Sequence, residues 1–114
     1  MIKIKRIYET ASEDDGYRIF IDRLWARGIS KGDAKIDLWF KEIAPTPALR
    51  KWFNHEAEKW DEFRKRYKEE LMANEYFLKQ IKELESKHHT ITLLYAAKDT
   101  EHSHAKVLEA VLKE

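Results

Sequence analysis

Hydrophobic and polar residues alternate at the start of the chain and again after a short acidic stretch. Ile2, Ile4 and Ile7 stand among basic residues, and the segment from Tyr17 to Leu24 repeats the same two-residue period. Such alternation with β-branched residues is typical of half-buried strands. Residues 90–97 form a continuous apolar run of β-formers, as expected of a strand covered on both faces. The pattern therefore predicts strands near 2–7, 17–24 and 90–97.

The segment between Ile36 and Ile43 fits two periods. Its apolar residues alternate as in a strand, yet a different subset of them also falls on one face of a helix. Trp39 and Phe40 suit a pleated surface, and Pro45 closes the segment. We therefore predict a strand near 36–43.

Residues 8–16, between the first two predicted strands, are polar and end in the turn-forming pair Asp15-Gly16. A helical crossover between parallel strands usually needs about a dozen residues, which is more than this link provides. Two arrangements are open. Either the two strands form an antiparallel hairpin, or the link contains one helical turn.

A helical period governs the middle and the end of the chain. Thr46 can cap a helix that has Pro47 at its first position. The clearest helix carries one apolar face made of Ala57, Trp60, Phe63, Tyr67 and Leu71. The expected helices lie near 46–54, 56–73, 75–86 and 101–113, with a short helical turn near 30–35. Together the elements predict a single α/β domain over residues 1–114, with a small, mostly parallel sheet of about four strands.

The composition limits the functions open to such a domain. The 22 basic and 21 acidic side chains leave a formal net charge of +1, which gives no electrostatic argument for nucleic acid or an anionic membrane. The absence of cysteine excludes disulfides, thiolate nucleophiles and Cys-ligated zinc. No apolar run approaches the roughly 20 residues of a membrane span, and no signal-peptide core is present, so we expect a cytoplasmic protein. The high charged fraction, with few glycines and prolines, resembles thermophile usage.

Polar residues follow two of the predicted strands and supply a candidate site. In open parallel sheets, ligands bind beyond the carboxyl ends of the strands. We therefore expect the residues after 17–24 to meet those after 90–97. The candidate ligand-binding residues are Arg23, Trp25, Arg27, Lys98, Asp99 and His102, and the candidate acids or bases are Asp22 and His104.

The expected ligand is a small anion. Arg23, Arg27 and Lys98 would hold it, and the N-terminus of the last helix, capped by Asp99 or Thr100, would attract it. Trp25 would form a wall, and the acid or base would allow hydrolase or transferase chemistry. No cofactor is expected.

Each candidate also has a purely structural interpretation. Asp22 and Arg23 can form an ordinary ion pair at a strand end, and Trp25 can serve core packing. His102 and His104 lie two residues apart, so on a helix they point to different sides and lack the i, i+4 spacing of a metal seam. No metal site is predicted.

A second hypothesis is a non-enzymatic module that binds nucleic acid or protein through its basic, aromatic helices. Its strongest feature is the cluster Arg64-Lys65-Arg66 with Lys68. The same helix carries six acidic residues, and mixed signs at helical spacing are typical of a solvated face. Nucleic acid is therefore the weaker alternative.

Several longer motifs carry a resemblance to a known family. They are Asp15-Gly16-Tyr17-Arg18, Asp22-Arg23-Leu24-Trp25-Ala26-Arg27-Gly28, Asp37-Leu38-Trp39, Lys41-Glu42-Ile43-Ala44-Pro45, Leu49-Arg50-Lys51-Trp52-Phe53, and Leu93-Leu94-Tyr95-Ala96-Ala97-Lys98-Asp99 followed by His102 and His104. In these motifs, over nearly its whole length, the chain resembles the YeaO-like family of small uncharacterised proteins. The resemblance implies an α/β domain with a predominantly parallel sheet, and it favours the strand interpretation of residues 36–43.

The chain departs from the family pattern at two places, where Ala26 replaces a usual proline and Ser103 a usual asparagine. More distant relatives carry cysteines at the positions of Tyr95 and Ser103, so thiol chemistry does not transfer to this chain. Some members carry transcription-regulator labels, but no helices followed by a β-hairpin, as in a winged helix, are expected here.

Overall fold

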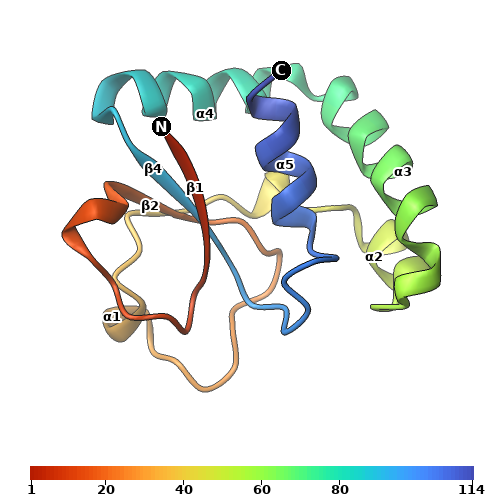
Figure 1. The fold of residues 1–114 in the computed structure, drawn as a ribbon, viewed down its shortest axis with the longest axis horizontal. Coiled ribbons are helices and arrows are strands. Elements are labelled where there is room, and N and C mark those ends of the chain that lie inside the picture. Colours follow the sequence, from red (N-terminus) through yellow and green to blue (C-terminus); the bar gives the residue numbers. More distant parts are fainter.

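Four parallel strands form one sheet in the order β1-β4-β2-β3 (Figure 1). The computed structural model describes residues 1–114. The strands are β1 (Ile2–Arg6), β2 (Tyr17–Phe20), β3 (Leu38–Trp39) and β4 (Ile91–Tyr95). The last strand in the chain, β4, lies inside the sheet, where Leu93 pairs with Ile4 on one side and Ile19 on the other. All five residues of β4 are buried, as its continuous apolar run predicted.

The link between the first two strands adopts the second of the two arrangements left open by the sequence. It contains one 3-10 turn, η1 (Glu13–Asp15), whose first turn is closed by a capping box between Ser12 and Asp15. The strands β1 and β2 run in the same direction and are separated by β4. The hairpin alternative was therefore wrong.

The strand predicted near 36–43 is much shorter than expected. Its last contact with β2 is the hydrogen bond from the Phe40 N–H to the Phe20 carbonyl. The chain then forms a 3-10 turn, η2 (Lys41–Ile43), which buries Ile43. The segment thus follows both predicted patterns. Its first half pairs in the sheet, and its second half is helical.

The remaining elements are helical. They are α1 (Lys31–Ala34), α2 (Pro47–Phe53), the 3-10 turn η3 (Ala57–Lys59), α3 (Trp60–Ala73), α4 (Glu75–His88) and α5 (His104–Leu112). The predicted cap of α2 is confirmed, since the Thr46 side chain accepts a hydrogen bond from the Leu49 N–H. The helix predicted from residue 101 begins only at His104. None of the helices has both the length and the apolar character that crossing a bilayer requires.

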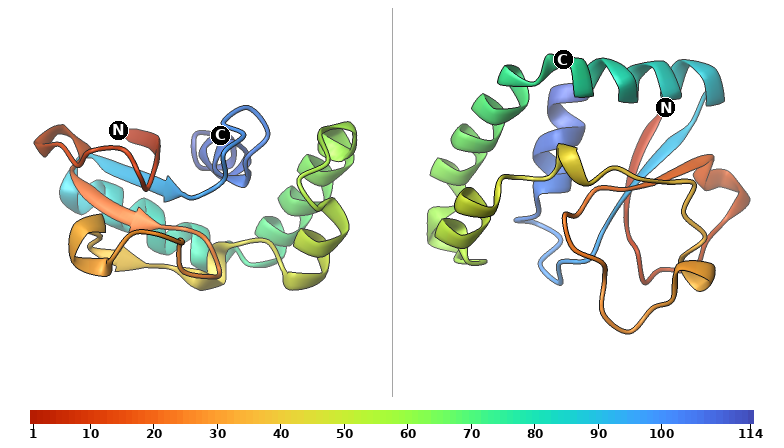
Figure 2. Two further views of the ribbon diagram at one scale, coloured as in Figure 1. Left: turned by 90° about the horizontal axis from the view of Figure 1, so that it is seen from below. Right: turned by 180° about the vertical axis from the view of Figure 1, so that it is seen from behind.

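The main hydrophobic core lies on one face of the sheet. There α5 contacts β1 and β4, and α4 contacts β2 and β4. The helix α3 packs on α5 and lies beyond it, away from the strands (Figures 1 and 2). Phe63, Tyr67 and Leu71 of α3 are buried, as the predicted apolar face requires, whereas Ala57 is exposed in the preceding turn.

A smaller cluster covers the opposite face of the sheet. Phe20 and Leu94 point to this side and are fully buried under the segment that connects β2 to β3. Trp25 and Trp39 pack against the cluster, with their ring centroids 5.2 Å apart in an edge-to-face arrangement.

A buried ion pair ties the start of β2 to its surroundings. Asp15 and Arg18 are 4 % and 5 % exposed, and their side chains form a short ion pair that Lys5 extends at 3.1 Å. Burial raises the pKa of the Asp15 carboxyl, but the Ser12 backbone N–H, Lys5 and Arg18 together hold that pKa below its usual value. The Arg18 guanidinium also donates to the carbonyls of Ala34 and Lys35. The first family motif therefore has a structural role.

Candidate functional site

The segments that follow β2 and β4 meet at the carboxyl edge of the sheet. Asp22 comes two residues after β2, and its Oδ2 accepts a hydrogen bond of 3.1 Å from the backbone N–H of Ala96, the first residue after β4. The structure thus brings together two of the stretches that the sequence singled out. Because parallel strands end at the same edge, this contact follows directly from the sheet topology.

His104, the first residue of α5, lies against Asp22. Its Nε2 is 3.0 Å from the Ile21 carbonyl oxygen and 3.2 Å from Asp22 Oδ1. A carbonyl oxygen can only accept, so Nε2 carries the N–H and donates it to Ile21, while Asp22 Oδ1 is in close contact with the same nitrogen. The Ile21 carbonyl has the better geometry, and Asp22 Oδ1 remains a buried acceptor without a hydrogen bond. The two side chains are only 14 % and 20 % exposed.

Tyr67 of α3 lies behind this pair. Its ring packs edge-to-face on His104, with centroids 6.0 Å apart, and its hydroxyl donates to the Ile43 carbonyl at 2.7 Å. Burial raises the pKa of the phenol well above its usual value, and the nearby charges of Glu70 and Asp22 add to the rise. The Tyr67 hydroxyl is therefore held as the donor to the Ile43 carbonyl. The sequence placed it in the core, and no local signal connects it with His104.

A second unsatisfied polar group lies one residue before His104. Ser103 occupies the N-cap position of α5 but its side chain caps no N–H, and its hydroxyl oxygen is buried without a hydrogen bond. Burial above all raises the pKa of the Tyr95 phenol, and the neighbouring Ser103 hydroxyl opposes that rise. The Tyr95 hydroxyl is therefore close to Ser103 Oγ, although the two do not meet the geometry of a hydrogen bond. Buried polar atoms normally have hydrogen-bond partners, so two such atoms without one, Asp22 Oδ1 and Ser103 Oγ, are unusual at one edge of a sheet.

Asp99 and His102 form a separate turn just before α5. Asp99 Oδ1 accepts hydrogen bonds from the N–H groups of Glu101 and His102, and Oδ2 lies 2.8 Å from His102 Nδ1. The bond from His102 is the leading reason that the pKa of Asp99 lies below its usual value. The prediction that Asp99 or Thr100 caps the last helix was wrong, because this local turn uses the same acceptor and delays the helix to His104.

Two arginines at the carboxyl edge are held by backbone carbonyls. Arg23 is half-buried and donates to the carbonyls of Ala44 and Pro45, at 3.2 and 3.4 Å. Arg6, at the end of β1, donates to the carbonyls of Ala96 and Ala97, both at 2.9 Å. Sequence reasoning missed Arg6, although the rule used for the other candidates, position at a strand's carboxyl end, also applies to it.

The other candidates do not join the Asp22–His104 pair. Trp25 packs on the opposite face of the sheet and donates its indole N–H to the Ile29 carbonyl. Arg27 and Lys98 are exposed, and their side chains make no hydrogen bond or ion pair. The structure therefore favours core packing for Trp25 and leaves Arg27 and Lys98 available to solvent.

The basic cluster on α3 is largely neutralised within the chain. Arg64 pairs with Asp61, Arg66 with Glu62, and Lys68 with Glu114. Arg66 also stacks over the Trp52 ring, with its guanidinium carbon 4.3 Å from the ring centroid. Alternating charges of this kind are what a solvated helix face requires.

Comparison with known proteins places the chain in a family. The family described as the inactive DUF488-N3 subclade matches residues 1–114. The chain belongs to this subclade. It is 46 % identical over 107 residues to the uncharacterized protein YeaO of Escherichia coli K12, covering 94 % of this chain and 92 % of that protein. It is 37 % identical over 111 residues to the uncharacterized protein Rv3073c of Mycobacterium tuberculosis H37Rv, covering 97 % and 92 %.

The match to the DUF488-N3 subclade confirms the YeaO-like resemblance that the motifs predicted. No solved structure matches the chain. The names of these relatives state no function.

Proposed function

We propose that this protein is a cytoplasmic binding protein for a small anionic molecule, held at the carboxyl edge of the sheet beside the N-terminus of α5. The observation that supports this proposal is the pair of unsatisfied polar atoms there, Ser103 Oγ and Asp22 Oδ1. A ligand that reaches either atom would recover part of the roughly 1–3 kcal/mol that an unpaired buried group costs.

The chemistry of the edge defines the ligand. The first N–H groups of α5 have no intrahelical partner and, with the helix dipole, favour an anion. The Ser103 hydroxyl can donate to the same anion, whereas the ionised Asp22 Oδ1 can only accept. The ligand therefore combines an anionic group with a hydroxyl or N–H donor, as in a hydroxy acid or a sugar phosphate. Lys98, exposed and unpaired, lies in the preceding loop and can add a positive charge.

Binding without turnover fits the geometry better than catalysis. His104 Nε2 is directed at the Ile21 carbonyl, and Asp22 Oδ2 is fixed by the Ala96 N–H, so both groups already have structural partners. No cysteine is available as a nucleophile. The name of the subclade, which calls it inactive, points in the same direction. Hydrolase or transferase chemistry, which Asp22 and His104 would allow in principle, is the less supported form of the proposal.

Nucleic-acid binding through α3 draws less support, because its basic side chains Arg64, Arg66 and Lys68 are paired with carboxylates of this chain. A binding site for phosphates would need these cations free.

A thermal-shift screen tests the proposal. Inorganic phosphate, hydroxy acids, sugar phosphates and nucleotides are added to the purified protein, and a ligand present at a hundred times its Kd should add about 2.7 kcal/mol of stability. The Ser103→Ala variant should weaken binding of the best ligand by about tenfold or more, the value of one hydrogen bond to a charged group. The matched control Ser86→Ala, on the exposed side of α4, should leave it unchanged.

Three results would contradict the proposal. If no anion shifts the melting temperature, or if Ser103→Ala and Ser86→Ala bind equally well, the carboxyl edge is not the site. If the protein hydrolyses a phosphate ester and His104→Gln abolishes that activity, binding without turnover is wrong.

A further inference from the structure

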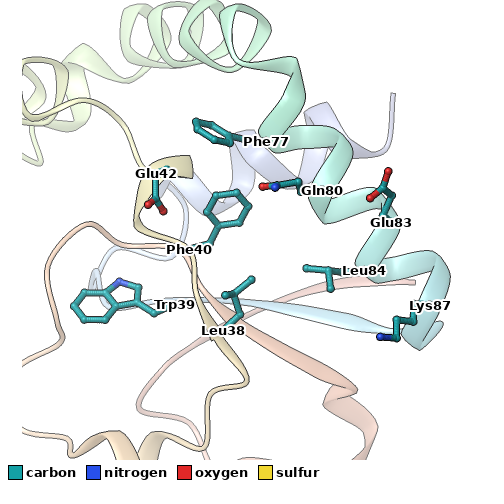
Figure 3. A pocket seen from close by; sticks show the side chains of 9 residues that line it. All are labelled: Leu38, Trp39, Phe40, Glu42, Phe77, Gln80, Glu83, Leu84 and Lys87. Carbon is teal, nitrogen blue, oxygen red and sulfur yellow. The ribbon is translucent and has the colours of Figure 1, made fainter.

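A groove of about 720 Å³ between β3 and α4 does not suit an anion (Figure 3). Five of its nine lining residues are hydrophobic, and its charged lining residues are Glu42, Glu83 and Lys87. The lysines beside it, Lys31 and Lys41, lie over the Trp39 ring, 5.3 and 4.2 Å from the ring centroid. An anion in the groove would therefore meet two carboxylates and one free ammonium. The cation that holds an anionic ligand is expected at the carboxyl edge itself.

Arg6 is a cation at the carboxyl edge without a carboxylate partner. It is the last residue of β1, it is half-buried, and it takes part in no ion pair. Arg18, Arg64 and Arg66, by contrast, each pair with a carboxylate. Removing a charge from water is costly unless another charge compensates it. The Tyr8 ring, 4.8 Å from the Arg6 guanidinium carbon, compensates only in part.

The guanidinium of Arg6 is fixed along one edge and open at its end. Its Nε donates to the Ala97 carbonyl and its Nη2 to the Ala96 carbonyl, both at 2.9 Å. A guanidinium has five N–H groups, so three remain, and they lie on Nη1 and Nη2 at the outer end of the side chain. The two carbonyls thus fix the plane of the fork, while its outer end has no acceptor within the protein.

Arg6 and Asp22 bind the same residue from two sides. The Ala96 carbonyl accepts from Arg6 Nη2, and the Ala96 N–H donates to Asp22 Oδ2 at 3.1 Å. The bonds within one residue separate its nitrogen from its oxygen by at most about 4 Å, so Nη2 and Oδ2 lie within about 10 Å of one another. A small molecule with a hydrogen bond at each end can bridge that distance.

The unpartnered Ser103 hydroxyl lies on the Arg6 side of the edge. Arg6 and Tyr95 are partners in the register of β1 and β4, so their side chains share one face of the sheet. Burial above all raises the pKa of the Tyr95 phenol, Arg6 opposes the rise, and Ser103 is close to the same hydroxyl. In the same way, burial raises the pKa of Tyr67 and Arg23 opposes that rise, which places Arg23 beside Tyr67 instead.

Two carboxylates near the Tyr95 phenol are engaged elsewhere. Burial is the main cause of the raised pKa of Tyr95, and the charges of Glu9 and Glu101 add to it. Glu9 Oε2 accepts the backbone N–H of Arg6 at 2.7 Å, and Glu101 Oε2 lies 3.4 Å from Lys106 Nζ. Neither carboxylate binds the Arg6 guanidinium, so the outer end of the fork is free for a ligand.

We infer that Arg6 holds the anionic group of the ligand, and that this group is a carboxylate or a phosphate bound by two parallel N–H···O bonds. The inference rests on the proposed function and deepens it by naming the cation and the shape of the anion. Carboxylates and phosphates have paired oxygens that match a guanidinium fork, whereas an ammonium acts as a single point charge. Ser103 and the first N–H groups of α5 complete the contacts of the anion, and Asp22 Oδ1 accepts from a donor elsewhere on the ligand.

Anion selectivity tests the inference, because a merely structural role of Arg6 would affect all anions alike. Binding of inorganic phosphate, lactate, glucose 6-phosphate and iodide is measured by NMR titration. Arg6→Lys keeps the charge but loses the fork, so it should weaken the tightest oxyanion at least about tenfold and iodide less than about twofold. The matched control Arg50→Lys, at an exposed position of α2, should change neither. Whether lactate or a phosphate binds more tightly identifies the anionic group.

A measurement on the unaltered protein makes the test independent of how the variant folds. The Arg6 Nε–H signal, assigned through the side-chain carbons, comes from a group that the Ala97 carbonyl holds in place. It should shift when the tightest oxyanion is added, and the corresponding signal of the exposed Arg50 should not.

Three outcomes would overturn the inference. If Ser103→Ala weakens oxyanion binding but Arg6→Lys does not, the proposed function stands and Arg6 only ties β1 to residues 96–97. If Arg6→Lys weakens the oxyanions and iodide alike and the wild-type Arg6 signal does not shift, its role is again structural. If none of the four anions binds, the inference is wrong, whereas the proposed function is wrong only if the wider thermal-shift screen also fails.

Discussion

Replacing Gly16 with alanine should destabilise the fold more than any other glycine substitution in the chain. Gly16 has φ 64° and ψ −136°, a combination that other residues avoid, and this strain alone costs about 1–3 kcal/mol. An added Cβ would also lie 2.2 Å from the Thr90 carbonyl oxygen. That oxygen accepts the hydrogen bond from the Tyr17 N–H at 3.0 Å, which closes the start of β2 against the residue before β4. Moving Thr90 away weakens this bond, at a further cost of about 1 kcal/mol or more.

The other two glycines provide matched controls. Gly28 has φ 80° but nothing lies within 4 Å of an added Cβ, so Gly28→Ala introduces the backbone strain without the clash. Gly32 lies in α1 with ordinary φ, so Gly32→Ala should be neutral or stabilising by about 0.5–1 kcal/mol.

Urea unfolding followed by tryptophan fluorescence gives the free energy of unfolding for each variant. The expected losses are about 2–5 kcal/mol for Gly16→Ala and about 1–3 kcal/mol for Gly28→Ala. A Gly16→Ala variant no less stable than Gly28→Ala would refute the argument that close approach of Thr90, rather than φ alone, requires glycine here.

Two further substitutions test buried polar groups. Asp15→Asn removes the carboxylate that faces the buried Arg18 guanidinium, and should cost about 3–5 kcal/mol at neutral pH in urea unfolding. The folded-state pKa of Asp15 is depressed, so its contribution is present above the unfolded value of about 3.8 and is lost as the pH falls through the folded value. The difference between wild type and Asp15→Asn should therefore shrink on acidification below pH 4, and a constant difference would contradict the assignment. Tyr67→Phe leaves the Ile43 carbonyl unsatisfied and should lower thermal stability by about 1–3 kcal/mol, measured by calorimetry. An unchanged melting temperature would show that water replaces the phenol.

The strands were predictable where the pattern that specifies them is local. The continuous apolar run of β4 and the alternation of β1 needed no knowledge of their neighbours. The length of β3 was overestimated because it depends on where β2 ends. Residues 36–43 carry no information about the end of β2. The last bond of β3, from Phe40 to Phe20, is made between residues twenty positions apart.

The candidate site was predictable only in its central pair. The rule that parallel strands end at one edge brought Asp22 and His104 together. The same rule could not distinguish the roles of residues within one turn. Arg23 and Trp25 are close to Asp22 in sequence, yet Arg23 donates to the backbone carbonyls of residues 44–45 and Trp25 packs on the opposite face of the sheet. Tyr67 depends on how α3 packs on α5, which no local pattern reveals.

The position of β4 determines the order in which this protein can fold during synthesis. β1 has β4 as its only neighbour, and β4 also separates β1 from β2. Until residues 91–95 have left the ribosome, the first strand therefore has no partner, and the sheet exists at most as the short β2–β3 pair. The contacts that close it join residues nearly ninety positions apart, such as Ile2 with Ile91, and such distant pairing slows folding. Closure of the sheet is therefore a late step in the folding of this domain, because both β1 and β2 need residues 91–95 as their partner.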